Sequence, residues 1–187
     1  MIFQKSLLQE IGIYKYGLID TKQIIFSDEV RSLCEGNVCR NYGTTWACPP
    51  AVGTIDECKE KSLEYDMALV FNAKYNLEDS FDYEGMLFGH KEFKKVCDKL
   101  ADLVKEKLMD YLLLSNEGCI RCCDCTYPHY PCRFPEKLFP SVEGFGIRID
   151  ALAKSANIKY INGENTVTYF GLLLFRKSDI YPLSKTE

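Results

Sequence analysis

The sequence predicts an α/β protein: a mixed or parallel sheet of about four strands, covered by helices, with two cysteine-rich loops at one end. Three observations lead to this prediction. Short apolar segments alternate along the chain with longer segments of helical periodicity. The 187 residues suffice for one core and show no repeat or linker, so we expect a single domain over residues 1–187. Cysteines gather in two groups, within residues 34–58 and 119–132.

The amino-terminal part of the chain predicts one strand and two helices. The strand is expected at residues 13–19. Ser27 is a favourable N-cap for a short helix over residues 28–34. Thr54 caps the second helix, because Glu57 three residues later completes a capping box.

The remaining chain predicts three strands separated by two helices. Residues 67–75 form a strand, because their apolar start is too short for a helix. The longest helical pattern lies between residues 83 and 110, where apolar side chains recur every three or four positions. A buried strand at 111–114 follows. Residues 141–157 are expected to be helical, and residues 166–176, rich in β-branched, aromatic and leucine side chains, form the last strand.

Strand order cannot be read from one sequence, so two arrangements stay open. With parallel crossovers, both cysteine loops lie at the end of the sheet where open α/β proteins bind ligands. The alternative is an antiparallel α+β arrangement of the ferredoxin-like kind.

The composition excludes several classes of partner. Apolar residues make up 47% and charged residues 27%, as in ordinary globular proteins. The net charge of −4 argues against a nucleic-acid partner, since a phosphate backbone requires a basic face. Lysines of residues 91–107 are interleaved with acidic residues and are interpreted as a solvated helix face, and nearby His90 has no ligand partner. Without a secretory signal or a long apolar stretch, we expect a cytoplasmic protein with no membrane partner.

The second group of cysteines has the spacing C-x2-C-x2-C-x6-C, and its candidate ligands are Cys119, Cys122, Cys125 and Cys132. Cytoplasmic cysteines more often bind metals than form structural disulfides. Three thiols at two-residue intervals can bind three corners of a [4Fe–4S] cluster. Structural zinc usually has two separated pairs of ligands, so zinc is the alternative metal.

The first group is less regular and comprises Cys34, Cys39, Cys48 and Cys58. Cys48 precedes two prolines, and a proline also follows the last ligand in bacterial ferredoxins. Ligation by Cys58 stays open, because this residue lies one helical turn after Ile55 and could face the core. Without Cys58, three thiolates would leave one coordination position open, as in reactive metal sites.

Other residues near the two groups have secondary roles. Cys97 lies on the apolar stripe of the long helix and Cys123 breaks the two-residue spacing, so neither is expected to be a ligand. Three arginines each neighbour a candidate ligand, namely Arg40, Arg121 and Arg133. Their positive charge would stabilise thiolates and raise the potential of a bound cluster.

Two blocks of sequence resemble a known family. The first reads V-R-x2-C-x2-N-x-C-x2-Y-G-x2-W-x-C-P-P over residues 30–50. The second, within residues 118–146, contains G-C-x2-C-x2-C, then P-C-R-x-P, then P-S-V-E-x-F-G. In both, the chain is similar to a microbial family described as predicted metal-binding protein, domain of unknown function 2284. The resemblance implies metal binding, with iron–sulfur chemistry in an anaerobe as the expectation, and implies no particular reaction.

Three functions follow from the cysteine patterns. The first is a redox protein with one or two [4Fe–4S] clusters that exchanges electrons with a partner protein. The second is an enzyme in which Cys34, Cys39 and Cys48 leave iron open to a substrate. The third is a zinc-stabilised interaction module without redox chemistry. Whether the chain is an enzyme stays open, because no nucleophile–base pair, carboxylate pair or nucleotide motif is present.

Overall fold

The computed structural model describes residues 2–180 of the chain. At its centre is a four-stranded sheet made of β1 (Lys15–Asp20), β2 (Met67–Asn76), β3 (Tyr111–Leu114) and β4 (Thr166–Phe175). The spatial order is β1-β2-β4-β3, and every neighbouring pair of strands is antiparallel. The prediction of a mixed or parallel sheet is therefore wrong, whereas the α+β alternative fits the observed sheet.

The apolar strands suggested a parallel sheet because both faces of this sheet are buried. Continuous apolar runs are typical of parallel strands, which helices cover on both sides. In β4, Leu173 and Phe175 enter one hydrophobic core, while Leu172 and Leu174 enter the core on the opposite face. All four side chains are fully buried. An antiparallel strand between two cores has the same apolar run, so the run does not specify strand direction.

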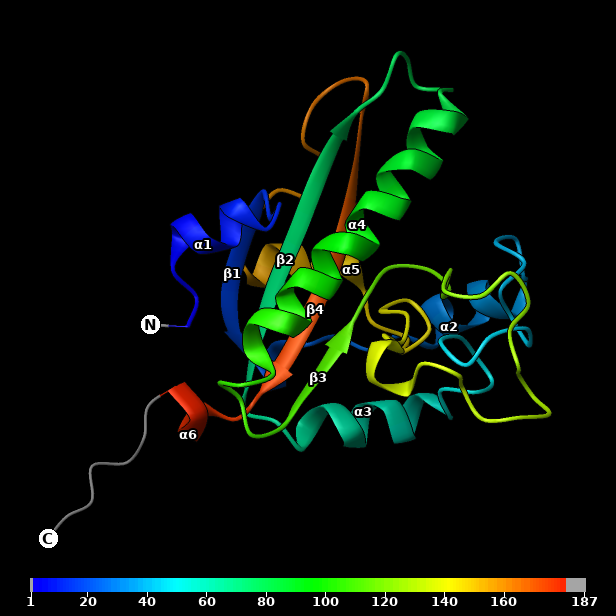
Figure 1. The fold of residues 1–187 in the computed structure, drawn as a ribbon, viewed down its shortest axis with the longest axis horizontal. Coiled ribbons are helices and arrows are strands. Elements are labelled where there is room, and N and C mark those ends of the chain that lie inside the picture. Colours follow the sequence, from blue (N-terminus) through cyan, green and yellow to red (C-terminus); the bar gives the residue numbers. More distant parts are fainter. Residues whose placement is uncertain (1, 181–187) are drawn as a thin grey trace, which may run out of the picture.

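The long helix α4 (Tyr83–Val104) covers one face of the sheet (Figure 1). Phe93 of this helix stacks on Phe71 of β2, with ring centroids 5.8 Å apart. The helix connects β2 to β3, which run in the same direction on either side of β4 and so form a split β-α-β unit. It ends before the predicted limit near residue 110, because the chain must turn back to enter β3.

Two shorter helices, α3 (Ile55–Leu63) and α5 (Ile149–Ser155), contribute to the core on the opposite face. The predicted capping box at the start of α3 is present, with Glu57 and Thr54 each bonding the other's backbone N–H. The helix expected at residues 141–157 is confined to α5, because the first part of that segment forms a buried turn instead.

The remaining elements are short. They are α1 (Lys5–Glu10), η1 (Thr21–Gln23), α2 (Asp28–Glu35), η2 (Pro135–Lys137) and α6 (Lys177–Ile180). Helix α2 starts where the sequence predicts, although Ser27 makes no side-chain capping hydrogen bond. Across residues 2–180, no helix combines the length and apolarity that a membrane crossing needs.

The core between α4 and the sheet can be tested at Phe71. Substitution F71A removes a fully buried ring and should lower the free energy of unfolding by about 3–5 kcal/mol. The matched control is F81A, which truncates a ring that is 90% exposed and should change stability by no more than about 0.5 kcal/mol. Urea unfolding followed by circular dichroism measures both, and equal effects would contradict this packing.

Candidate metal centre

Four thiols of the second cysteine loop (residues 116–134) line one narrow cavity. This loop contains no helix or strand, and the short helix η2 follows it directly. The four cysteines are the predicted ligands Cys119, Cys122, Cys125 and Cys132, and Trp46 and Leu138 complete the apolar part of the lining. All ten cysteines of the chain are free thiols.

Hydrogen bonds close the stretch between the third and fourth thiols of this set. Thr126 Oγ1 donates to the carbonyl of Pro131 at 2.9 Å, just inside that stretch. Arg133 donates to the carbonyl of Asp124 at 2.8 Å, just outside it. The two bonds return Cys132 to the cavity that the other three thiols line. The neighbouring Cys123 is exposed and is not among the lining residues.

Arg121 also lines the cavity, but an acidic side chain already balances its charge. Its guanidinium forms a two-point ion pair with Asp98 of α4, in which one contact measures 2.8 Å. The hydrogen bonds that Arg121 donates to Asp98 raise the pKa of Arg121. Of the other two arginines, Arg133 belongs to the lining and Arg40 is exposed.

The thiols of Cys34, Cys39 and Cys48 form the second set. Cys34 lies at the end of α2, and the other two lie in the first cysteine loop (residues 36–53). Burial raises the pKa of Cys48 to about 12, and the neighbouring thiols of Cys39 and Cys34 add to this rise. Burial is also the main cause that raises the pKa of Cys34, and the charges of Glu143 and Cys39 raise it further. The three thiols are therefore within electrostatic reach of one another.

Cys58 and Cys97 lie in the hydrophobic cores. Cys58 is only 1% exposed, and its Sγ lies 3.4 Å from the carbonyl oxygen of Val52. Burial raises its pKa, and the strongest opposing charge is that of Arg31. Cys97 is fully buried in α4, and burial raises its pKa to about 11. The structure thus brings three cysteines of the first group together and turns Cys58 toward the core.

The two cysteine loops lie side by side, to the right of the sheet in Figure 1. Trp46 of the first loop donates from Nε1 to the carbonyl of Tyr130 at 3.1 Å. Its ring also meets Tyr127 edge to face, with centroids 4.9 Å apart. Gly118 packs so closely on Asn41 that an added Cβ would lie 2.4 Å from Oδ1 of that side chain. The loops therefore form one continuous structure.

A buried turn, which we call the docking turn (residues 140–146), connects both loops to the sheet. The backbone N–H of Ser141 donates to Ala47 at 2.8 Å, and that of Val142 donates to Ser115 at 2.8 Å. The guanidinium of Arg31 also donates to the carbonyl of Gly144 in this turn. The docking turn therefore contacts helix α2, Ala47 of the first cysteine loop and the residue that follows β3.

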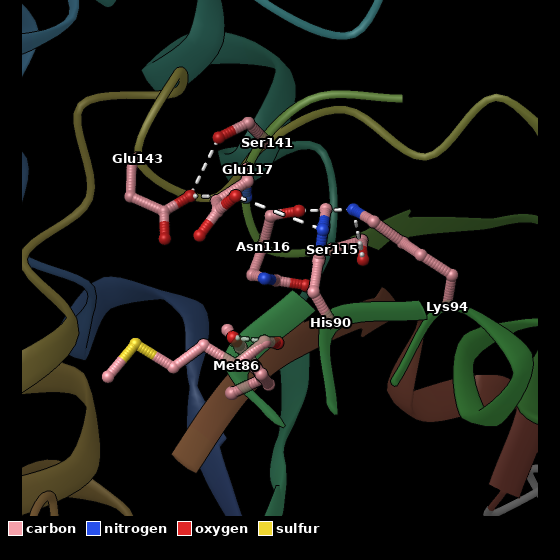
Figure 2. A network of polar contacts seen from close by, with 9 residues as sticks. Met86, His90, Lys94, Ser115, Asn116, Glu117, Ser141 and Glu143 are labelled. Atoms are coloured by element: carbon pink, nitrogen blue, oxygen red, sulfur yellow. Dashed lines mark hydrogen bonds and ion pairs between the residues drawn. The ribbon is translucent and has the colours of Figure 1, made fainter. Parts of the chain in front are cut away.

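A polar network that the sequence did not reveal lies between α4 and the docking turn (Figure 2). Helix α4 contributes His90 and Lys94, which are 9% and 8% exposed. The chain after β3 contributes Asn116 and Glu117, and the docking turn contributes Glu143. Interpreting the lysines of α4 as a solvated face is therefore wrong for Lys94, although Lys95 and Lys105 do pair with acidic residues on the exposed side.

Two carboxylates occupy the upper part of this network in Figure 2. Glu143 accepts hydrogen bonds from Ser141 Oγ at 2.7 Å and from the backbone N–H of Glu117 at 3.1 Å. The carboxylate of Glu117 lies 3.9 Å from Nδ1 of His90. Burial, and then the charge of Glu143, raises the pKa of Glu117. The network thus links the start of the second cysteine loop and the docking turn to α4 through charged groups.

Helical spacing is the signal that could have revealed these residues. His90, Lys94 and Cys97 lie at steps of four and three, on the same side of α4 as the apolar stripe. A histidine and a lysine that continue such a stripe are expected to be buried, and buried polar groups need partners. Nε2 of His90 and both amide atoms of Asn116 have none among residues 2–180.

The donor chemistry of the two thiol sets fits a thiophilic metal. Four thiols of one loop share a cavity, and Lys94 and Arg121 add positive charge near Cys119. In the part of the chain that the structure describes, no group of three His, Cys, Asp or Glu side chains has an arrangement that could hold a metal ion. The cavity measures about 20 Å³, enough for one water molecule, so a cluster would fit only if the loop widened. The backbone of the second cysteine loop is irregular, so widening the loop would break no hydrogen bonds of a sheet or helix.

The buried imidazole of His90 should make stability depend on pH. Burial, and then Lys94 and Lys91, lowers its pKa from 6.5 to about 4. Between these values the unfolded chain binds a proton that the folded chain does not, so stability falls as the pH is lowered from 7 to 4. The contribution reaches about 3 kcal/mol.

Urea unfolding of the metal-free protein at several pH values measures this effect. The difference in stability between pH 7 and pH 4 should shrink in H90Q. The matched control is H129Q, which changes the other histidine of the chain, an exposed one. In H129Q the stability difference between pH 7 and pH 4 should equal that of the wild type. The same pH dependence in H90Q and wild type would contradict the assignment.

The model of the family described as "Predicted metal-binding protein (DUF2284)" matches residues 17–175. This range includes all ten cysteines and the whole sheet, except for the first two residues of β1. No curated protein and no solved structure matches the chain. The thiol sets and the extent of this match lead to one conclusion: the chain belongs to the predicted metal-binding family DUF2284.

Proposed function

We propose that this protein is an iron–sulfur protein that transfers single electrons, with a [4Fe–4S] cluster held by Cys119, Cys122, Cys125 and Cys132. The observation that carries the proposal is that these four thiols line one cavity. Three of them are spaced by two residues, as in cluster-binding loops, whereas structural zinc is usually bound by two separated pairs. When bound, the cluster would supply a one-electron redox site.

The surface beside Cys132 suits electron exchange with a partner protein. A shallow groove of about 380 Å³ lies there, lined by Trp46, residues 128–132 and Leu138. Aromatic rings and prolines dominate this lining, and such surfaces are enriched in protein interfaces. A partner seated in the groove would lie directly against Cys132. We therefore place the redox partner on this face, and we expect the cytoplasm as the compartment.

Cys34, Cys39 and Cys48 would hold a second centre. The position of Cys58 favours an open site there, because its Sγ lies against Val52 within the core. An open coordination position supports the second candidate function, an enzyme whose substrate binds this metal. Among acidic side chains, Glu143 has the largest effect on the pKa of Cys34.

Metal analysis of anaerobically purified protein tests the cluster. We expect about eight iron and eight sulfide per chain for two cubes, or about four of each for one. C125S should lose about four iron and four sulfide, because it removes a thiol from the cavity lining. The matched control is C123S, which changes the adjacent exposed thiol and should keep the full content. Stoichiometric zinc without sulfide would instead support the zinc-stabilised module.

Substitution of Cys58 distinguishes a four-thiol from a three-thiol first centre. We expect C58A to keep the iron content and the cluster spectrum, because the lost thiol faces the core. The C58A substitution should lower the free energy of unfolding by about 1 kcal/mol. C48A should remove the metal of that centre, and a similar loss of iron in C58A would identify Cys58 as a ligand.

A further inference from the structure

The ammonium group of Lys94 is buried at the point where α4 meets the end of β3. The residue is 8% exposed. Its Nζ donates to Ser115 Oγ at 3.1 Å and to the carbonyl of Asn116. Figure 2 shows the side chain reaching from the helix toward these two groups. Both acceptors belong to the chain that leads directly into the second cysteine loop.

No carboxylate among residues 2–180 forms an ion pair with this buried cation. The two carboxylates of the network act on it only at longer range, since Glu143 accepts a hydrogen bond from Ser141 and Glu117 lies 3.9 Å from Nδ1 of His90. A buried ammonium that only neutral oxygens contact is costly, because water is lost without a compensating charge. Because Glu117 and Glu143 act on Lys94 only from a distance, a closer anion would offset more of this cost.

The thiols of the second loop are the groups that can supply that negative charge. Lys94 and Cys119 line the same small recess, together with Arg121. Asp98 already balances Arg121, whereas no carboxylate of the described residues pairs with Lys94. Lys94 thus places a positive charge beside a predicted ligand of the centre.

We propose that Lys94 is the fixed counter-charge of the metal centre in the second cysteine loop. The inference rests on the proposed function, since it requires thiolates loaded with a metal there. Four thiolates around a cluster carry net negative charge, and reduction adds one more electron. A fixed cation beside the centre stabilises the reduced state more than the oxidised state, so it raises the midpoint potential.

Neutral substitutions at position 94 test the proposal, with position 95 as the control. K94Q keeps a hydrogen-bond donor for Ser115 and Asn116 but removes the charge, and K94M removes both. Lys95 is on the same helix, but its side chain is 64% exposed and pairs with Glu92 at 2.5 Å. K95Q and K95M therefore remove the same charge from the solvated side of α4.

The readout is the midpoint potential from redox titration followed by electron paramagnetic resonance. At a fixed ambient potential, K94Q should lower the ratio of reduced to oxidised cluster about tenfold, or about 59 mV for a one-electron couple. The signal of a second cluster should shift less, and K95Q should change neither. If K94M folds poorly but K94Q does not, the hydrogen bonds stabilise the fold and K94Q gives the test.

Two results would overturn the inference without affecting the proposed function. A cluster whose potential is unchanged in K94Q would exclude a counter-charge role, as would equal shifts in K94Q and K95Q. If the protein contains zinc and no sulfide, the iron–sulfur proposal fails while the inference stays testable. In that case K94Q should lose zinc to a chelator about tenfold faster than K95Q, and equal rates would refute it.

Discussion

Three backbone hydrogen bonds at the docking turn determine how the cysteine loops are placed. Ser115 donates to Pro140 at 2.9 Å, Val142 donates to Ser115 at 2.8 Å, and Ser141 donates to Ala47 at 2.8 Å. The two hydrogen bonds of Ser115 continue the direction of β3 beyond its four residues. The hydrogen bond of Ser141 holds the segment of the first cysteine loop that carries Cys48. Neither loop has regular structure of its own, so these bonds fix their separation. A side chain at Gly144 would push on Pro49, since its Cβ would lie 3.1 Å from Cδ of that proline.

The sequence predicted the elements of the fold better than their arrangement. The capping box at Thr54, the start of α2 and the apolar stripe of α4 are local signals, and all three appear where expected. Strand direction depends on which strands pair across the sheet. The continuous apolar run of residues 172–175 could not reveal it, because both faces of β4 are buried.

The candidate site shows the same division between local and tertiary information. The spacing within residues 119–132 is local, and the loop does turn these four thiols toward one cavity. The orientation of Cys58 and the burial of Lys94 depend instead on the packing of α3 and α4 on the sheet. Which metal the thiols bind depends on coordination chemistry that neither the spacing nor the fold contains.

Backbone conformation near the thiols is also unusual. Among residues 2–180, five non-glycine residues have a positive φ, and three of them lie in the cysteine loops: Asn37 at 52°, Arg40 at 60° and Glu117 at 47°. Such conformations cost about 1 to 3 kcal/mol each and persist where the surroundings impose them. At Asn37, the side chain offsets part of this cost by accepting the backbone N–H of Tyr42 at 3.0 Å. The loops therefore hold their thiols with some conformational strain.

Trp46 is the only tryptophan of the chain, and it lies in the wall of the cavity that the four thiols share. Its indole N–H donates a hydrogen bond to the carbonyl of Tyr130, which holds the ring against the second cysteine loop. Tryptophan fluorescence therefore comes from a single ring at the site. We expect the intensity and wavelength of this emission to change when the cavity is filled, so that occupancy can be followed without an added label.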